Sequence, residues 1–408
     1  MKILIITPYF YYSNKKQFTK NNTGFGFLLK EIASYISNFD EVFVLSSVIT
    51  KECEIDGFSV VSHSWSDVII NIKIKNLLTE FCKFLKVNMG VMNKIKHVFY
   101  TIDSGYTEYI IKKLKPDIVH FHAVGYRTEL GINICERLKQ KYVLTLHGLV
   151  GFVEFTPEYL KISERKLLKE ASEKNIPVTV ISTGIKNRIG KYYAINNLDN
   201  ITVVTNGTDV NLKKTKLNIN IRDKYQIPSD CKLMLCIGNI SKRKNQEQLI
   251  RAFSLLDDKI KEYLYILIIG NIDEGLELNK LIIDFNLIEK IKLCGFVNKE
   301  ELTAYYEEAD YNAVVSKDEG FGLSMIEAFY YGIPTVTFSD LDAVPDLFDE
   351  KSMVLVNGRS DEELAHGIEI LCNSHWDRKF IKDYAKKFSL EKMAEKYHKV
   401  YIQALRDE

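Results

Sequence analysis

Short apolar runs alternate with helix-like segments along the first half of the chain. These runs have the length of single strands and are hydrophobic at nearly every position, which is typical of parallel strands covered on both faces. The alternation therefore predicts an α/β domain built on a doubly wound parallel sheet. The predicted strands are 2–7 (KILIIT), 41–47, 58–63, 116–123, 142–148, 178–183 and 201–207.

A second series of the same kind begins after a polar, lysine-rich stretch at 211–222. The repetition predicts two doubly wound, Rossmann-like domains that face each other across a cleft. The expected boundaries are 1–208 for the first domain, 209–376 for the second and 377–408 for closing helices. The strands predicted in the second domain are 232–239, 263–271, 291–296, 311–316 and 335–338, and helices are predicted at 245–256, 277–285 and 300–308.

The stretch from Ser316 to Thr337 reads SKDEGFGLSMIEAFYYGIPTVT and predicts a glycine loop, a helix and a further strand. Gly320 and Gly322 allow close approach of a ligand to the backbone, and the free N–H groups of a helix start attract anions. Glu319 and Glu327 are placed to accept hydrogen bonds from sugar hydroxyls. The pattern suits a diphosphate with a sugar at each end, although a plain strand-to-helix turn explains a single glycine loop equally well.

A cationic loop follows the first strand of the second domain. Lys242, Arg243 and Lys244 lie at the carboxyl end of this strand, directly ahead of a predicted helix. Such a loop is suited to pairing with diphosphate oxygens. A solvated basic turn is the alternative, and the second phosphate-compatible loop of the same sheet favours the binding interpretation.

Two histidines end neighbouring strands of the first domain. His122 and His147 stand at the carboxyl ends of the strands at 116–123 and 142–148. Ligands of open α/β sheets bind outside these ends. A lone histidine is usually an ordinary core or surface residue, but two at equivalent strand ends favour a cleft.

The first helix is preceded by a further glycine loop, with Gly24 and Gly26 on either side of Phe25. A dinucleotide fingerprint would need a third glycine where Leu29 stands, and the gap after the first strand is too long for one. An NAD site is therefore not expected. The two glycines are instead expected to bring backbone N–H groups near a phosphate.

The composition excludes several other classes of protein. At 408 residues, with 46% hydrophobic residues, 27% charged residues and a net charge of +1, the chain has no global field that favours nucleic acid. Its seven cysteines are scattered and lack the C-x-x-C spacing, so we expect a reduced cytoplasmic protein without a disulfide framework or a metal site. The apolar start at 1–8 is too short for a signal peptide, and no window reaches spanning length.

A basic amphipathic segment runs from Ile72 to His97 and carries six lysines with Glu80 as its only acid. Such a segment can contact an anionic membrane surface, which would place the protein at the inner face of the membrane. The alternative is a solvated helix face whose lysine stems cover apolar surface.

Together these motifs resemble the family 4 glycosyltransferases of GT-B fold. The matching elements cover almost the whole chain, and the E-x7-E element from Glu319 to Glu327 is the most specific of them. The others are the first strand with its glycine loop, D-I-V-H-F-H, T-L-H-G, N-G-T-D, G-N-I-S-K-R-K-N and F-S-L-E-K-M-A-E-K-Y.

The resemblance assigns roles to individual residues. Glu327 corresponds to the residue that binds the ribose hydroxyls, Glu319 to the one that contacts the donor sugar, and Lys244 to the cation that neutralises the diphosphate. His147 corresponds to the histidine beside the reacting sugar carbon, and His122 lies on the acceptor side. The implied catalytic residues are His147, Lys244 and Glu319, and the implied donor-binding residues are Gly24, Gly26, Asn239, Arg243, Lys244, Gly320, Phe321, Gly322, Leu323 and Glu327.

Two positions depart from the family pattern. Asn239 stands where the family usually has an arginine, and Arg243 is a candidate substitute from the same loop. Asp342 and Ala343 stand where a glycine pair is common, which bears on the donor sugar pocket. The D-x-D formed by Asp340 and Asp342 is a metal motif of the other glycosyltransferase fold and is not expected to bind metal here.

The resemblance implies transfer of a sugar, with retention of configuration, from a nucleotide diphosphate to a glycan or lipid-linked acceptor in cell-surface polysaccharide assembly. No cofactor or metal is expected, because protein cations and a helix dipole can stabilise the diphosphate. The segment 377–408 is expected to return to the first domain. Two alternatives stay open, a GT-B sugar-nucleotide epimerase and a non-catalytic GT-B partner subunit that binds glycan.

Overall fold

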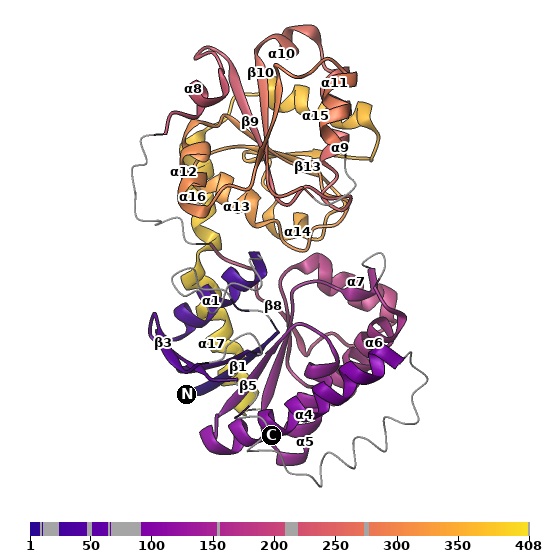
Figure 1. The fold of residues 1–408 in the computed structure, drawn as a ribbon, viewed down its shortest axis with the longest axis vertical. Coiled ribbons are helices and arrows are strands. Elements are labelled where there is room, and N and C mark those ends of the chain that lie inside the picture. The colour runs from indigo at the N-terminus through magenta and orange to yellow at the C-terminus, as the bar shows by residue number, and fades with distance from the viewer. Residues whose placement is uncertain are drawn as a thin grey trace. The chain divides into compact units, whose positions relative to one another are not determined.

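The structure is a computed structural model that describes residues 1–8, 10, 24–46, 51–63, 66, 91–152, 156–208, 219–272 and 277–406 (Figure 1). For 24 and 91–99 it describes the backbone alone. The side chains of the basic segment Ile72–His97 therefore lie outside the described residues, and its membrane contact stays a prediction.

The chain folds into two compact units. The first contains 1–181, 185–204 and 390–408, and the second contains 182–184 and 205–389. The block predicted as closing helices is divided between them. Helix α16 (Arg378–Ala385) belongs to the second unit, where it packs on α13 (Leu323–Tyr330), and only α17 (Leu390–Arg406) joins the first unit.

An eight-stranded sheet forms the centre of the first unit, in the order β3-β4-β2-β1-β5-β6-β7-β8. Neighbouring strands are parallel, except that β3 and β4 are antiparallel. The prediction of a doubly wound sheet is confirmed, and β3 is an addition to it. The strands are β1 (Lys2–Thr7), β2 (Glu41–Ser46), β3 (Cys53–Ile55), β4 (Phe58–Val61), β5 (Ile118–His122), β6 (Tyr142–Leu146), β7 (Val178–Val180) and β8 (Ile201–Val203).

Helices cover both faces of this sheet (Figure 1). Helix α17 packs against α1 on one face, and its fully buried Tyr397 and Tyr401 complete a core with Ile3 and Ile32. Helices α4, α5 and α6 pack in series on the other face. The helical elements of the unit are α1 (Gly24–Ile36), α4 (Val91–Leu114), α5 (Tyr126–Leu138), η2 (Val150–Phe152), α6 (Glu158–Glu173), α7 (Thr183–Tyr193) and α17.

The second unit contains a six-stranded parallel sheet in the order β11-β10-β9-β12-β13-β14. The strand order reverses between β9 and β12, so the loops that follow these two strands become neighbours at a topological switch point. The cationic loop follows β9 and the glycine loop follows β12. The strands are β9 (Lys232–Ile237), β10 (Leu264–Ile269), β11 (Ile291–Gly295), β12 (Tyr311–Val314), β13 (Thr335–Phe338) and β14 (Met353–Val356).

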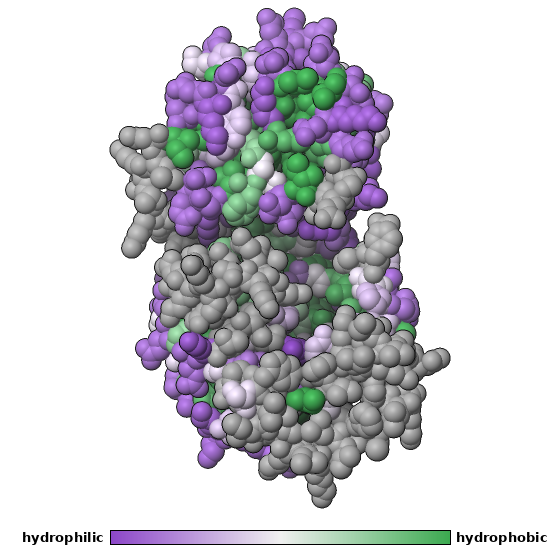
Figure 2. Space-filling view, viewed as in Figure 1, coloured by the Kyte–Doolittle hydropathy of each residue, from purple (hydrophilic) through white to green (hydrophobic). Residues whose placement is uncertain are grey.

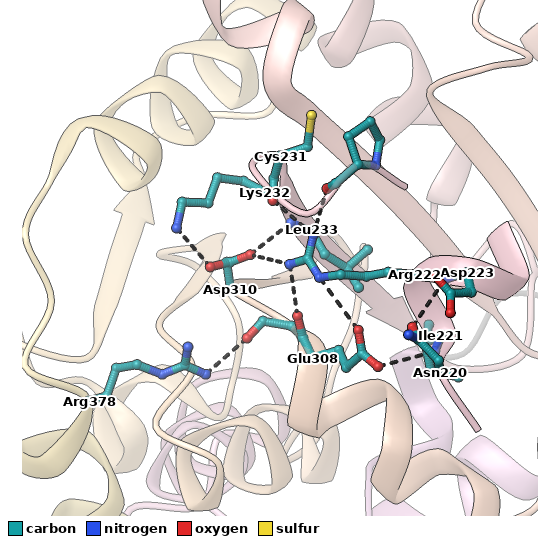
Figure 3. A network of polar contacts seen from close by, with 12 residues as sticks. Asn220, Ile221, Arg222, Asp223, Cys231, Lys232, Leu233, Glu308, Asp310 and Arg378 are labelled. Atoms are coloured by element: carbon teal, nitrogen blue, oxygen red, sulfur yellow. Dashed lines mark hydrogen bonds and ion pairs between the residues drawn. The ribbon is translucent and has the colours of Figure 1, made fainter. Parts of the chain in front are cut away.

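A polar network lies at the amino-terminal ends of two central strands of this sheet (Figure 3). Arg222 donates to Asp310 Oδ2 at 3.2 Å, and the same oxygen accepts from the amide of Leu233 at 3.0 Å. Arg222 also donates to the carbonyl of Glu308 at 3.2 Å. The network joins the amino-terminal ends of β9 and β12. The two loops of interest lie at the opposite, carboxyl-terminal ends of these strands.

The second unit also contains α8 (Ile221–Tyr225), α9 (Gln246–Leu255), α10 (Asp258–Tyr263), α11 (Leu278–Asp284), α12 (Lys299–Glu308), α13, α14 (Val344–Leu347), α15 (Asp361–Asn373), α16 and η3 (Lys386–Phe388). On the face drawn in Figure 2, hydrophilic residues cover most of the periphery of the second unit, and hydrophobic residues gather nearer the middle of this unit. Within the described part of the chain, no helix is both long and apolar enough to cross a bilayer.

Candidate functional site

The two loops at the switch point of the second unit are bonded to each other. Lys244 forms an ion pair with Glu319 across the loops, and both side chains are largely buried. Arg243 donates from Nη1 to the carbonyl of Asp318 at 2.9 Å, and its own carbonyl accepts from the amide of Lys317 at 2.8 Å. The structure therefore brings together the cationic loop and the first carboxylate of the E-x7-E element.

Glu319 is surrounded by hydrogen-bond donors. Its Oε1 accepts from the amide of Gly322 at 3.2 Å, and its Oε2 accepts from Lys244 and, at 3.4 Å, from Ser316 Oγ. Burial by itself raises the pKa of Glu319, but the charges of Lys244 and Arg243 and the Gly322 amide outweigh it, so the pKa is lowered. The resemblance implies that Gly322 binds the donor, but in this structure its amide donates a hydrogen bond to Glu319. Binding a donor there would require that bond to be exchanged.

Close packing at the strand ends depends on glycine at two positions. A Cβ atom on Gly270 would lie 2.1 Å from the carbonyl oxygen of Gly238, so the loops after β9 and β10 could not approach as they do. Gly322 directly precedes α13 and has φ +73°, a left-handed conformation that favours glycine, and a Cβ there would meet Met325 at 2.2 Å. Gly320 precedes it, and Phe321 is buried.

The neighbouring cations of the loop after β9 are more exposed than Lys244. Lys242 and Arg243 are exposed, as is the uncharged Asn239. The loop backbone is held from below by Gln246, a buried residue whose Nε2 donates to the carbonyl of Asn239 at 3.3 Å. Asn239 thus occupies the family arginine position without a charge, and Arg243 reaches the glycine loop instead.

The second carboxylate of the E-x7-E element is oriented by a tyrosine. Glu327, on α13, accepts a hydrogen bond from Tyr306 of α12 at 2.8 Å. The ring of Tyr306 is buried and stacks on Tyr331 at 5.1 Å with an interplanar angle of 8°. Burial first, and then the charge of Glu327, raise the pKa of Tyr306 well above 10, so it stays a hydrogen-bond donor. Leu323, the first residue of α13, lies a turn before Glu327.

Arg359, which follows β14, supports the start of the glycine loop. Its Nη1 donates to the carbonyl of Ser316 at 2.7 Å, and its guanidinium lies 4.1 Å from the ring of Phe338. Its Nη2 binds Asp340 Oδ1 at 2.5 Å. The first acid of the D-x-D sequence is therefore paired with this arginine.

The first unit holds a separate cluster of three histidines at the carboxyl ends of β5 and β6, in which His120 and His122 are buried and His147 is half-buried. His122 Nδ1 and His147 Nε2 lie 2.9 Å apart, and their rings stack. His120 is hydrogen bonded to Thr145 at 2.6 Å and to Tyr401 of α17 at 2.7 Å. Burial lowers the pKa of His120 and of His147 to about 3, the charge of His147 adding to the shift of His120, and lowers that of His122 well below 6.5.

The buried histidines make the free energy of unfolding depend on pH. Between pH 6.5 and about 3 the unfolded chain binds protons that the folded chain does not, so the free energy of unfolding falls as the pH is lowered through this range. We expect a loss of about 1 kcal/mol for each histidine between pH 6.5 and 5.5. Urea unfolding at pH 7.5, 6.5 and 5.5 measures it.

A matched pair of variants isolates this contribution. His122→Asn is expected to reduce the pH dependence, whereas His375→Asn, which replaces an exposed histidine, is expected to leave it unchanged. An unfolding free energy that stays flat from pH 6.5 to 5.5 in the unmodified protein would contradict the burial of neutral imidazoles.

The first turn of α1 lies beside His147. The ring of Phe25 meets the His147 ring edge-on at 4.7 Å. Gly24 and Gly26 were predicted in a loop, but both lie inside the helix, which begins at Gly24. Among the described residues, His147 Nδ1 and His122 Nε2 have no hydrogen-bond partner although both atoms are buried.

Two family models match the chain. The model for glycosyl transferases group 1 covers 218–388, and the model for glycosyltransferase family 4 covers 93–212. The chain belongs to the family 4 glycosyltransferases. It is a nucleotide-sugar-dependent enzyme of GT-B fold, as its motifs predicted.

Several known proteins are similar to this glycosyltransferase. An uncharacterised glycosyltransferase of Methanocaldococcus jannaschii is 26% identical over 77% of this chain and 83% of its own. The O-antigen biosynthesis glycosyltransferase WclY of Escherichia coli is 25% identical over 83% of this chain and 95% of its own. The fold resembles a glycosyltransferase of Rickettsia africae, with a TM-score of 0.72, 18% identity and coverage of 100% and 99% of the two chains. It also resembles Anabaena HepE in complex with UDP and glucose, with a TM-score of 0.68, 14% identity and coverage of 99% and 100%.

Four supporting residues of the glycosyltransferase were missed by the sequence analysis. Gln246, Tyr306 and Arg359 hold the loops and the carboxylate of the second unit, and His120 links the histidine cluster to α17. Only Gln246 is close in sequence to the residue it supports. Tyr306, Arg359 and His120 are far in sequence from the residues they support, so their roles become visible only in the folded structure.

Proposed function

We propose that this enzyme transfers a sugar, with retention of anomeric configuration, from a nucleotide diphosphate to a glycan or lipid-linked glycan acceptor. The reaction would serve cell-surface polysaccharide assembly in the cytoplasm, consistent with the O-antigen enzymes among its relatives. The observation that carries the proposal is the contact between Lys244 and Glu319, with Glu327 on the helix α13 that follows the loop of Glu319.

The proposed chemistry follows from charge. Cleavage of the bond between the sugar and the phosphate leaves negative charge on the diphosphate and positive charge on the sugar carbon. Lys244, Arg243 and the start of α13 would stabilise the diphosphate electrostatically, so the proposal requires no divalent metal. Glu327 would accept hydrogen bonds from the ribose, and Glu319 from the donor sugar.

The acceptor and residues of the first unit would carry out the attack on the sugar carbon and position the reacting sugar. The acceptor hydroxyl attacks the face that the phosphate leaves, and a departing phosphate oxygen takes its proton, so no enzymic nucleophile is assigned. His147, whose Nδ1 is buried without a partner among the described residues, would donate to or accept from a hydroxyl of the reacting sugar. Gly24 and Gly26, in the turn beside it, would approach the phosphates.

A panel of nucleotide sugars tests the proposal. The full chain is incubated with each donor and an acceptor extract, and the product linkage is assigned by NMR. Transfer with inversion would remove the retaining mechanism. Isomerisation of the donor without acceptor would indicate an epimerase, and tight nucleotide binding without any turnover would indicate a non-catalytic subunit.

A further inference from the structure

The first unit contains a cavity of about 440 Å³ that the proposed roles do not yet use. It opens at the carboxyl ends of β1 and β5, and α4, the start of α5 and α6 provide its other walls. Its volume suits a small organic ligand such as a sugar. Tyr100, Tyr126 and Tyr159 line it, and aromatic faces of this kind can pack against a sugar ring.

The start of α5 faces this cavity without a side-chain cap. Gly125 precedes the helix and has no side chain with which to cap its first turn. The first N–H groups of a helix have no intrahelical acceptor and carry partial positive charge. Within the described part of the chain, a Cβ atom on Gly125 would meet no atom within 4 Å, so there is room for a larger group beside the start of the helix.

Arg127, in the same turn, adds a guanidinium group to the wall. Its Nε lies 3.1 Å from Asp103 Oδ2, and the group lies 5.0 Å from the ring of Tyr100. Its two terminal amino groups have no hydrogen-bond partner among the described residues. Asp103 is the one carboxylate among the described residues that line the cavity, and it is also paired with His63. The charge of Asp103 is therefore already engaged.

The last residue of β5 points to a ligand independently of the helix. His122 lines the cavity, is fully buried, and its Nε2 has no partner among the described residues. A buried imidazole nitrogen without a partner costs free energy unless a ligand satisfies it.

We infer that this cavity binds a phosphate group of the acceptor. The helix amides, the guanidinium fork and the imidazole would donate hydrogen bonds from three directions. This arrangement suits a tetrahedral anion with several oxygens better than a carboxylate with two. The inference rests on the proposed function, because it names the chemical class of acceptor that the transferase takes. Either a soluble sugar phosphate or the headgroup of a phospholipid supplies the group.

Calorimetry on the full chain tests the inference with inorganic phosphate, glucose 6-phosphate and glucose as probes. Vesicles of phosphatidylglycerol and of phosphatidylcholine form a second arm. Arg127→Gln is expected to weaken phosphate binding at least tenfold. Gly125→Leu is expected to abolish it by filling the space in front of the helix. Arg137→Gln is the matched control, since Arg137 ends the same helix, pairs with Glu108 at 2.6 Å and does not line the cavity.

The outcomes separate the sources of the phosphate. Arg127-dependent binding of glucose 6-phosphate, with glucose unbound, identifies a soluble acceptor. Arg127-dependent binding confined to phosphatidylglycerol vesicles identifies a lipid headgroup. Absence of binding to any phosphate compound, or equal loss in Arg127→Gln and Arg137→Gln, overturns the inference. A parallel UDP titration keeps the donor site separate, because failure of UDP to bind the unmodified protein would instead count against the proposed function.

Discussion

Replacing Lys244 with alanine is expected to lower kcat by about 10²–10³-fold, the usual effect of removing one preorganised group that stabilises charge in the transition state. Lys244 is held in the loop after β9 by Glu319 and lies against Gly238, so its ammonium is positioned before any donor arrives. The diphosphate would lose its most buried cation, and Asn239 supplies no charge to replace it. Steady-state kinetics with the best donor of the panel measures the change.

Lys242→Ala is the matched control for this variant. Lys242 lies in the same loop but is exposed, so its removal is expected to change kcat less than twofold. Lys244→Ala also leaves the largely buried Glu319 without its ion pair, which destabilises the fold. The double variant Lys244→Ala, Glu319→Gln removes that unpaired charge, and it should recover melting temperature without recovering kcat. Activity within twofold of the unmodified enzyme in Lys244→Ala would rule out its role as the leaving-group cation.

The sequence predicted the sheets well because parallel strands buried on both faces are nearly continuous in hydrophobicity. Strands β1 and β13 have the predicted bounds. The elements it missed are short or depend on a neighbour. Strand β3 is a three-residue antiparallel edge strand, and β14 is four residues long and pairs only with β13. Strand β3 has no pattern that exceeds the signal of an ordinary loop, whereas β14 is an apolar run (MVLV) of the same length as β13 that the sequence analysis did not assign.

The start of α1 shows where local propensity was misleading. Two glycines within three residues disfavour a helix, so a loop was predicted at Gly24 and Gly26. The helix nevertheless begins at Gly24, and Phe25 packs on His147 there. Tertiary contact can override glycine propensity when the same turn partly buries an aromatic residue, as it does Phe25.

The candidate site was predictable as far as its residues lie at strand ends. Lys244 and Glu319 each follow a strand, and the reversal of strand order makes their loops neighbours. The supporting residues come from elsewhere, since Arg359 is 43 residues from Ser316 and Tyr401 is 281 residues from His120. A single sequence contains no local pattern for such pairs.

Glu327→Ala is expected to weaken nucleotide binding about 10–100-fold, because hydrogen bonds to a charged group contribute roughly 1.5–3 kcal/mol each. Calorimetric titration of UDP and GDP measures the change. Tyr306→Phe keeps the stacked ring but removes the hydrogen bond that orients Glu327, so it should weaken binding by a smaller factor. Glu307→Ala removes an exposed carboxylate from the same helix as Tyr306 and should change affinity less than twofold. Equal nucleotide affinity in Glu327→Ala and Glu307→Ala would exclude the ribose contact. In that case the loss of Glu327 would affect binding no more than the loss of an exposed carboxylate.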